Sequence, residues 1–279
     1  MLSELLKVQL NSDLIRLICF INYLIVLSSL KQKTISGVLW SCVERFSVQG
    51  IQFVIMVIIL LPSDYGMIGM LAIFIAIAQT LIDSGFSNAL IQKKDRSEID
   101  YSTVFYFNIV VGIILYFILF FSSPLIARFY NTPELTGLTR VLALNLFINS
   151  LAVVQRAILS IKRDFKTQAK ASFSAAIISG IVGIVMAYTG FGVWSLAVQT
   201  VLNAFVNTVL LWIFSKWIPL KVFSFESFKK LFAFGSKLLA SGLLDTIYRN
   251  IYTIVIGKKF ASTDLGYFTR ADQFAQFPS

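Results

Sequence analysis

Long apolar stretches separated by short polar connections dominate the pattern along this chain. A helix needs roughly 20 largely apolar residues to cross about 30 Å of hydrocarbon. Seven stretches meet this length, at residues 36–61, 65–83, 101–121, 137–161, 171–189, 191–214 and 233–257. Prolines fall in or beside the connections, where a missing N–H costs little: Pro62, Pro124, Pro133 and Pro219. The pattern predicts an all-α, polytopic transmembrane helix bundle of about seven spans.

Composition narrows the classes of protein that fit this pattern. The 279 residues are 57% apolar and 14% charged, whereas soluble chains average about 45–50% and about 25%. The net charge of +10 would suit nucleic acid, but so apolar a chain is not soluble enough to reach it, so we expect no nucleic-acid partner. The chain has no histidine, which excludes imidazole acid–base catalysis and imidazole metal ligands. We expect no cofactor, no metal ion and no enzyme activity, although a membrane enzyme that does not use histidine is considered below.

Basic residues are distributed unevenly among the connections. Lysine and arginine are concentrated after the second, fourth and sixth stretches, and the alternate connections carry almost none, apart from Lys258 and Lys259 after the seventh. Because cytoplasmic loops are enriched in these residues, the start of the first span of this multi-pass protein is expected to be cytoplasmic. Residues 1–30 contain only a short apolar run and are interpreted as an extension, either interfacial or not native.

Polar side chains recur along single helical faces within the predicted spans. The positive members, Arg156, Arg45 and Arg249, lie about 8, 13 and 18 Å from the cytoplasmic helix ends at 1.5 Å per residue. Arg45 and Arg156 have no acid one turn away in their own helix. Guanidinium groups bind phosphate oxygens bidentately and keep their charge when buried. The sequence therefore predicts a ladder of cations for an anionic substrate, with amides that hydrogen-bond sugars: Gln49, Gln52, Asn149 and Asn203.

Acidic residues on the same stripes are candidates for coupling to a proton or cation gradient. They are Glu44, Asp83 and Asp245. Each polar position also has a structural alternative. The amides could serve only as hydrogen bonds between helices. Asp245 and Arg249, one turn apart, could simply neutralise each other, and Asp83 could act as a cap or anchor.

Four segments resemble the Wzx-type oligosaccharide flippases, of the O-antigen and colanic acid kind, in the multidrug/oligosaccharidyl-lipid/polysaccharide (MOP) superfamily. The resemblance runs from about residue 31 to the end and is closest to the colanic-acid exporter branch. Each segment is weakly specific alone, but the four occur in the family's order. They are KTISGVLWS from Lys33, DSGFSNALIQKK from Asp83, QRAILSIKRDFK from Gln155 and KKFASTDLGYFTRA from Lys258.

The resemblance implies two six-helix lobes that pass an undecaprenyl-pyrophosphate-linked oligosaccharide across the inner membrane. On this basis 31–215 is the amino-terminal lobe, 216–232 a cytoplasmic connection and 233–279 the start of a truncated second lobe. Family members are nearly twice this length. The implied partners are the lipid-linked oligosaccharide, membrane lipid, a proton or cation gradient and the polysaccharide polymerase machinery. Arg156 falls within a matched segment, whereas Arg45 and Arg249 depend on the stripe pattern alone.

Three other functions stay open at this point. A multidrug or cation antiporter of the same superfamily would need a cavity dominated by acids, and here the acids do not outnumber the arginines. A membrane glycan polymerase or ligase would carry a sizeable external loop, whereas the longest external connection predicted here has about 15 residues. A non-transporting, truncated bundle is the third.

Overall fold

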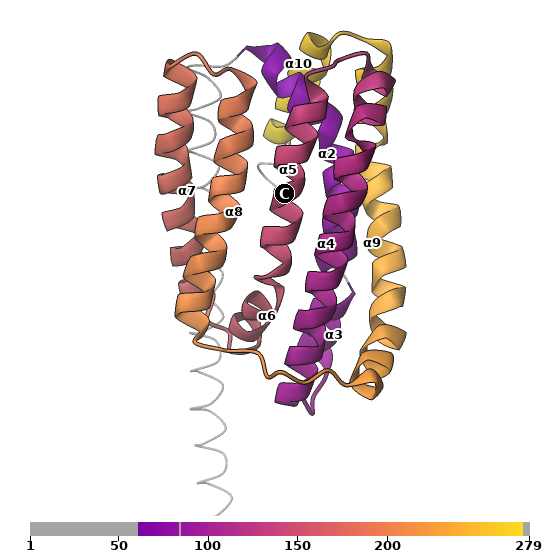
Figure 1. The fold of residues 1–279 in the computed structure, drawn as a ribbon, viewed down its shortest axis with the longest axis vertical. Coiled ribbons are helices and arrows are strands. Elements are labelled where there is room, and N and C mark those ends of the chain that lie inside the picture. The colour runs from indigo at the N-terminus through magenta and orange to yellow at the C-terminus, as the bar shows by residue number, and fades with distance from the viewer. Residues whose placement is uncertain (1–60, 84, 276–279) are drawn as a thin grey trace, which may run out of the picture.

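A computed structural model describes residues 61–83 and 85–275, and within these ranges the chain is helical with no strand (Figure 1). Residues 1–30 and the first predicted span, 36–61, lie outside the described part except for Leu61. The helices, in chain order, are α2 (Pro62–Asp83), α3 (Phe86–Gln92), α4 (Glu98–Tyr130), α5 (Leu135–Ser150), α6 (Val153–Ile161), α7 (Phe165–Tyr188), α8 (Val193–Ser215), α9 (Phe225–Lys259) and α10 (Ser262–Ala275).

The expected all-α, membrane-spanning bundle is confirmed. Among the described residues, α4, α7, α8 and the segment formed by α2 and α3 are long and apolar enough to cross a membrane. The pair α5–α6 qualifies as a fifth span, although its halves are bent by 42°. The predicted seventh span falls within α9, which is 35 residues long but more polar and not among these helices.

Helix α4 continues beyond the predicted end of its span, and this corrects the placement of Pro124 in a connection. The helix has 33 residues, about 50 Å at 1.5 Å per residue. Pro124 lies inside it, so the carbonyl of Phe120 lacks its usual N–H partner. The hydroxyl of Ser123 donates to that carbonyl at 2.7 Å. A neighbouring serine therefore makes the proline compatible with a continuous helix.

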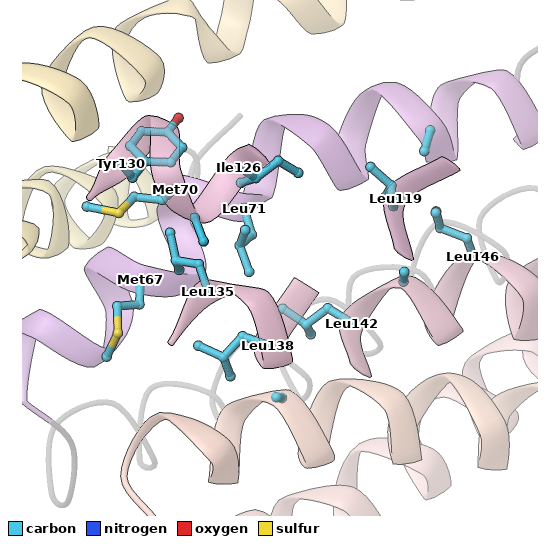
Figure 2. Packing of buried hydrophobic residues seen from close by; sticks show 14 of the residues in the cluster. Met67, Met70, Leu71, Leu119, Ile126, Tyr130, Leu135, Leu138, Leu142 and Leu146 are labelled. Carbon is cyan, nitrogen blue, oxygen red and sulfur yellow. The ribbon is translucent and has the colours of Figure 1, made fainter. Parts of the chain in front are cut away.

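Helix α5 occupies the centre of the bundle. Leucines on it are almost completely buried, at Leu135, Leu138, Leu142 and Leu146. Figure 2 shows them packed against Met67, Met70 and Leu71 of α2 and Leu119 and Ile126 of α4. Because α5 is enclosed by α2, α4 and α8, a polar group on this helix has side chains from several helices within reach.

The connections between helices lie at the two ends of the bundle, in two groups. Those after α3, α6 and α8 lie at the lower end in Figure 1, and those after α4, α7 and α9 lie at the upper end. The lower connections carry most of the lysines and arginines, including Lys93, Arg96, Lys162 and Arg163. We call this lower end the basic end. The structure thus groups the basic connections as the positive-inside rule requires for one membrane face.

Helices α2 and α10 begin in the same way and cross closely at their first turns. The sequence PSDYG from Pro62 corresponds to STDLG from Ser262. Asp64 accepts a hydrogen bond from the Leu61 N–H at 3.2 Å, and Asp264 accepts one from the Ala261 N–H at 3.3 Å. A Cβ on Gly66 would collide with the Ser262 carbonyl, and one on Gly266 would collide with that of Pro62. The contact is therefore reciprocal and requires glycine on both helices.

This crossing predicts a specific disulfide cross-link. A Cβ built on Gly69 lies 2.8 Å from the Thr269 hydroxyl, so Gly69→Cys with Thr269→Cys should form a disulfide under mild oxidation in a Cys19→Ser, Cys42→Ser background. Adding Gly66→Val should abolish the cross-link, because its side chain forces the helices apart. Gly183→Ala, in the separate α7–α8 pair, is the control. The cross-link is measured by gel mobility. A cross-link that still forms in the Gly66→Val variant would contradict this packing.

Candidate functional site

The interruption between α5 and α6 determines where Arg156 points. The two helices meet at Leu151 and Ala152 with a bend of 42°. Backbone carbonyls freed by the bend are bound from α8, since Thr208 Oγ1 donates to Ile148 at 3.3 Å and Trp212 Nε1 donates to Leu151 at 2.9 Å. These bonds compensate for the missing helical ones in a region without water. The expected continuous helix over 137–161 is therefore wrong, and beyond the bend α6 packs against α3, α4, α7 and α8.

A chain of polar side chains connects α2, α5 and α6. Gln79 donates to the Asp83 carboxylate at 2.5 Å, and Asn149 donates to the Gln79 side-chain oxygen at 3.2 Å. Arg156 donates through a terminal nitrogen to the Asn149 oxygen at 3.0 Å. Asp83 and Arg156 also attract each other electrostatically. We call the set Gln79, Asp83, Asn149 and Arg156 the polar network.

Two further side chains support the network from the side. Asn145, one turn before Asn149, accepts a hydrogen bond from it at 3.2 Å. Gln168 of α7 donates to the Arg156 carbonyl at 3.1 Å and to the Ser160 hydroxyl at 3.0 Å. The first residues of α7 therefore hold α6 in place. The sequence reasoning missed Gln168, because it lies in a segment interpreted as a polar connection.

Arg156 keeps an unused donor. Its Nε is buried and has no hydrogen-bond partner in the part of the chain that the structure describes. A buried donor of a charged group without a partner is costly, and guanidinium normally binds through its fork of N–H groups. One terminal nitrogen is engaged by Asn149. Within the polar network, Nε of Arg156 is thus a buried donor that no described residue satisfies.

Arg249 and Asp245 lie elsewhere. They form an ion pair one turn apart on α9, with 2.9 Å between Nε and a carboxylate oxygen and with 70% and 58% of their side chains exposed. No interaction among the described residues joins either of them to the polar network. The pair thus corresponds to the alternative in which the two charges neutralise each other.

Of the remaining candidate residues, one makes a contact between two helices and the others lie in the segment that the structure does not describe. Asn203 donates to Ser179 at 3.1 Å across the α7–α8 pair, which corresponds to the alternative of a hydrogen bond between helices. Glu44, Arg45, Gln49 and Gln52 lie outside the described residues. Of the predicted site, the described part of the chain therefore brings together Asp83, Asn149 and Arg156.

The chemistry available in the network is that of binding. One carboxylate, one guanidinium and two amides offer hydrogen-bond donors to an oxyanion and both donors and acceptors to hydroxyl groups. Among the described residues, no group of three or more cysteine, aspartate or glutamate side chains could hold a metal ion. The arrangement suits an uncharged sugar or a phosphorylated group, held between α2 and the α5–α6 bend.

The chain is similar in sequence to several known proteins. The chain is 28% identical to the teichuronic acid biosynthesis protein TuaB of Bacillus subtilis (strain 168) over 255 residues, covering 90% of this chain and 53% of that protein. It is 28% identical to the lipopolysaccharide biosynthesis protein WzxC of Escherichia coli (strain K12), covering 90% and 52%. It is 24% identical to the succinoglycan biosynthesis transport protein ExoT of Rhizobium meliloti (strain 1021), covering 86% and 49%. The chain thus spans about half the length of these relatives.

A solved structure and a family model complete the comparison. The fold is similar to that of a multidrug resistance MATE family transporter of the MOP superfamily, solved in an inward-facing conformation, with a TM-score of 0.55 and 18% identity over 85% of this chain and 57% of that one. The model of a family described as "Polysaccharide biosynthesis protein" matches residues 55–279. Because this match covers well over half of the chain and agrees with the resemblance to Wzx-type proteins, the chain belongs to that polysaccharide biosynthesis protein family.

Proposed function

We propose that this chain forms the amino-terminal lobe and the start of the second lobe of a transporter for undecaprenyl-pyrophosphate-linked oligosaccharide. It would move this substrate across the bacterial inner membrane for polysaccharide or lipopolysaccharide biosynthesis, with the basic end cytoplasmic. Family membership supports the proposal, as do relatives whose names refer to lipopolysaccharide biosynthesis and to succinoglycan biosynthesis transport. The lobes would be 31–215 and 233–279, joined by 216–232.

The unused Nε of Arg156 carries the proposal. The Nε atom is buried, but the Arg156 side chain as a whole is only half-buried beside Asn149, and a pyrophosphate oxygen that reached it would complete the hydrogen bonding of the guanidinium. Arginine suits this role better than lysine, because its fork binds two oxygens and its charge persists in a low dielectric. Asn149 and Gln79 would hydrogen-bond the first sugar. In the undescribed segment, Arg45, Gln49 and Gln52 are proposed to extend this surface.

Asp83 is proposed to couple transport to a proton or cation gradient. It is bound by Gln79 and attracted by Arg156. When the substrate pyrophosphate takes Arg156 as its partner, Asp83 loses its compensating charge and can accept a proton or a cation instead. Glu44 remains a second candidate for this role. Asp245 is less suited, because its charge is already balanced by Arg249, and Arg249 is correspondingly less available to the substrate.

A multidrug or cation antiporter is the second candidate function, favoured by the similarity of fold to a MATE family transporter. Such a pump needs a chamber that attracts cations. The polar network has one acid and one permanent cation, so its net charge is balanced. A network without net charge offers a cationic drug no net attraction, so the antiporter is the less well supported of the two functions. Contact with the polysaccharide polymerase machinery is a further proposal that follows from the family.

The role of Arg156 can be tested in a chimera. Residues 31–215 would replace the corresponding half of the WzxC protein in cells that lack their own WzxC. Arg156→Ala should lower exported polysaccharide at least tenfold, since hydrogen bonds to a charged group contribute about 1.5–3 kcal/mol each. Arg128→Ala, which removes an exposed arginine, should leave export within about twofold. Equal export from the Arg156 variant and the unsubstituted chimera would refute the pyrophosphate site.

The coupling role of Asp83 requires a different measurement. The same chimera, purified into proteoliposomes, would be assayed for movement of a fluorescent undecaprenyl-pyrophosphate oligosaccharide with and without an imposed pH or sodium gradient. Asp83→Asn keeps an oxygen that accepts from Gln79 but removes the titratable charge. It should abolish stimulation by the gradient and leave the unstimulated rate within about threefold. Stimulation that persists in the variant would assign coupling to another residue.

The two candidate functions predict opposite results for cationic dyes. Cells producing the chimera should accumulate as much ethidium as cells without it, because the network offers no excess of negative charge. The measurement is fluorescence of cells loaded with dye. Energy-dependent extrusion that disappears in Asp83→Asn would favour the antiporter.

A further inference from the structure

Arg140 is an arginine within a predicted span that the polar-stripe pattern did not include. It lies five residues after the start of α5, about 8 Å along the helix from the end opposite the basic end. Nine residues separate it from Asn149, which places the two on opposite faces of α5 at 100° per residue. Arg140 therefore points away from the polar network, toward α4. Its function is not explained by the proposed transport site.

Helix α4 holds the guanidinium of Arg140 in a fixed position. Pro124 leaves the Phe120 carbonyl without a helical partner, and the Ser123 hydroxyl donates to it at 2.7 Å. The same hydroxyl accepts a hydrogen bond from Arg140 Nε at 3.1 Å. The guanidinium carbon lies 4.5 Å from the centre of the Phe120 ring, within cation–π range.

This arrangement orients one edge of the guanidinium and leaves the other free. Ser123 is completely buried, so its hydroxyl is a fixed anchor for Nε. The terminal nitrogens make no hydrogen bond to any residue that the structure describes. They are also not among the buried unsatisfied atoms, so they lie at the accessible edge. A guanidinium held at Nε with its outer edge open can receive two oxygens of an anion.

The side chains near this edge are apolar, and no acid among the described residues forms an ion pair with Arg140. Ion pairs in the described part of the chain involve Lys93, Lys230 and Arg249, and none involves Arg140. Leu144, one turn further along the same face of α5, has 37% of its surface exposed, and Phe121 next to Phe120 has 71% exposed. Exposed leucine and phenylalanine on a membrane-spanning helix face lipid. An uncompensated arginine in lipid is costly, so a lipid anion is the partner that its position requires.

We propose that Arg140, positioned by Ser123 and Phe120, binds the phosphate of an anionic membrane lipid at the end of the bundle opposite the basic end. The distance of about 8 Å between the start of α5 and Arg140 is close to the thickness of one headgroup layer. The lipid is either a bilayer phospholipid such as phosphatidylglycerol or a polyprenyl phosphate. The site is separate from the polar network and does not depend on the proposed function.

The test is native mass spectrometry of the full chain in detergent with one added lipid at a time. The lipids are phosphatidylglycerol, undecaprenyl phosphate and diacylglycerol, the last of which has no phosphate. Arg140→Gln should lower the bound fraction of a phosphorylated lipid about tenfold and leave diacylglycerol unchanged, because the anion loses its charged fork. Arg128→Gln removes the same charge from an exposed position near the same end of α4 and should leave binding within about twofold.

Two further variants separate positioning from folding. Arg140→Lys keeps the charge but not the fork, so binding should fall between that of wild type and that of Arg140→Gln. Phe120→Leu removes the ring beneath the guanidinium but keeps an apolar side chain, so it should weaken lipid binding about threefold while the unfolding temperature without added lipid changes little. If undecaprenyl phosphate responds more strongly than phosphatidylglycerol, the site selects the polyprenyl carrier, and equal responses define a general phospholipid site. The proposal would be overturned if Arg140→Gln bound both phosphorylated lipids as well as the wild type does. It would also be overturned if Arg128→Gln lost as much lipid binding as Arg140→Gln.

Discussion

The absence of water inside the hydrocarbon layer is the constraint on which this structure depends. Every polar group there must find its partner in the protein, because an unpaired one costs several kcal/mol. The bend between α5 and α6 satisfies the constraint through Thr208 and Trp212, which bind the freed carbonyls. Pro124 in α4 satisfies it through Ser123. Each irregularity in a helix is thus matched by a specific side chain.

The same constraint connects the fold to the proposed site. A broken span can expose polar groups within the membrane at the point of the break, whereas a continuous helix offers only the side chains on its surface. Here the bend turns Arg156 toward Asn149, and Asn149 in turn meets Gln79 and Asp83 of α2. The network is nearly complete, and its exception is the Nε of Arg156. Other buried atoms, such as those of the Asn108 amide in α4, also lack a partner. What distinguishes Arg156 Nε is its permanent positive charge, which is why we propose a ligand there.

Much of the bundle could be predicted from the sequence, because spans depend on local apolar length and the stripes depend on helical period. Asp83, Asn149 and Arg156 were found in this way. The break at Leu151 could not be, since no proline or glycine marks it and its support, Trp212, comes from a helix about sixty residues later. Pro124 was misplaced because the compensation by Ser123 depends on side-chain geometry.

The predicted cation ladder shows another limit of the sequence. Depth along a helix follows from counting residues, but the direction around the bundle depends on how helices pack. Arg249 has a suitable depth yet pairs with Asp245 on an exposed face of α9. Arg140 was missed for the converse reason: it is the one charged residue of α5 and no polar stripe continues from it, so only contact with Ser123 and Phe120 distinguishes it.

The most direct test of the central claim is a structure of the full-length protein bound to an undecaprenyl-pyrophosphate oligosaccharide, determined by electron cryomicroscopy. The account predicts a pyrophosphate oxygen within about 3 Å of Arg156 Nε, between α2 and the α5–α6 bend. A pyrophosphate bound elsewhere, with the Arg156 side chain still hydrogen-bonded only to Asn149, would contradict it.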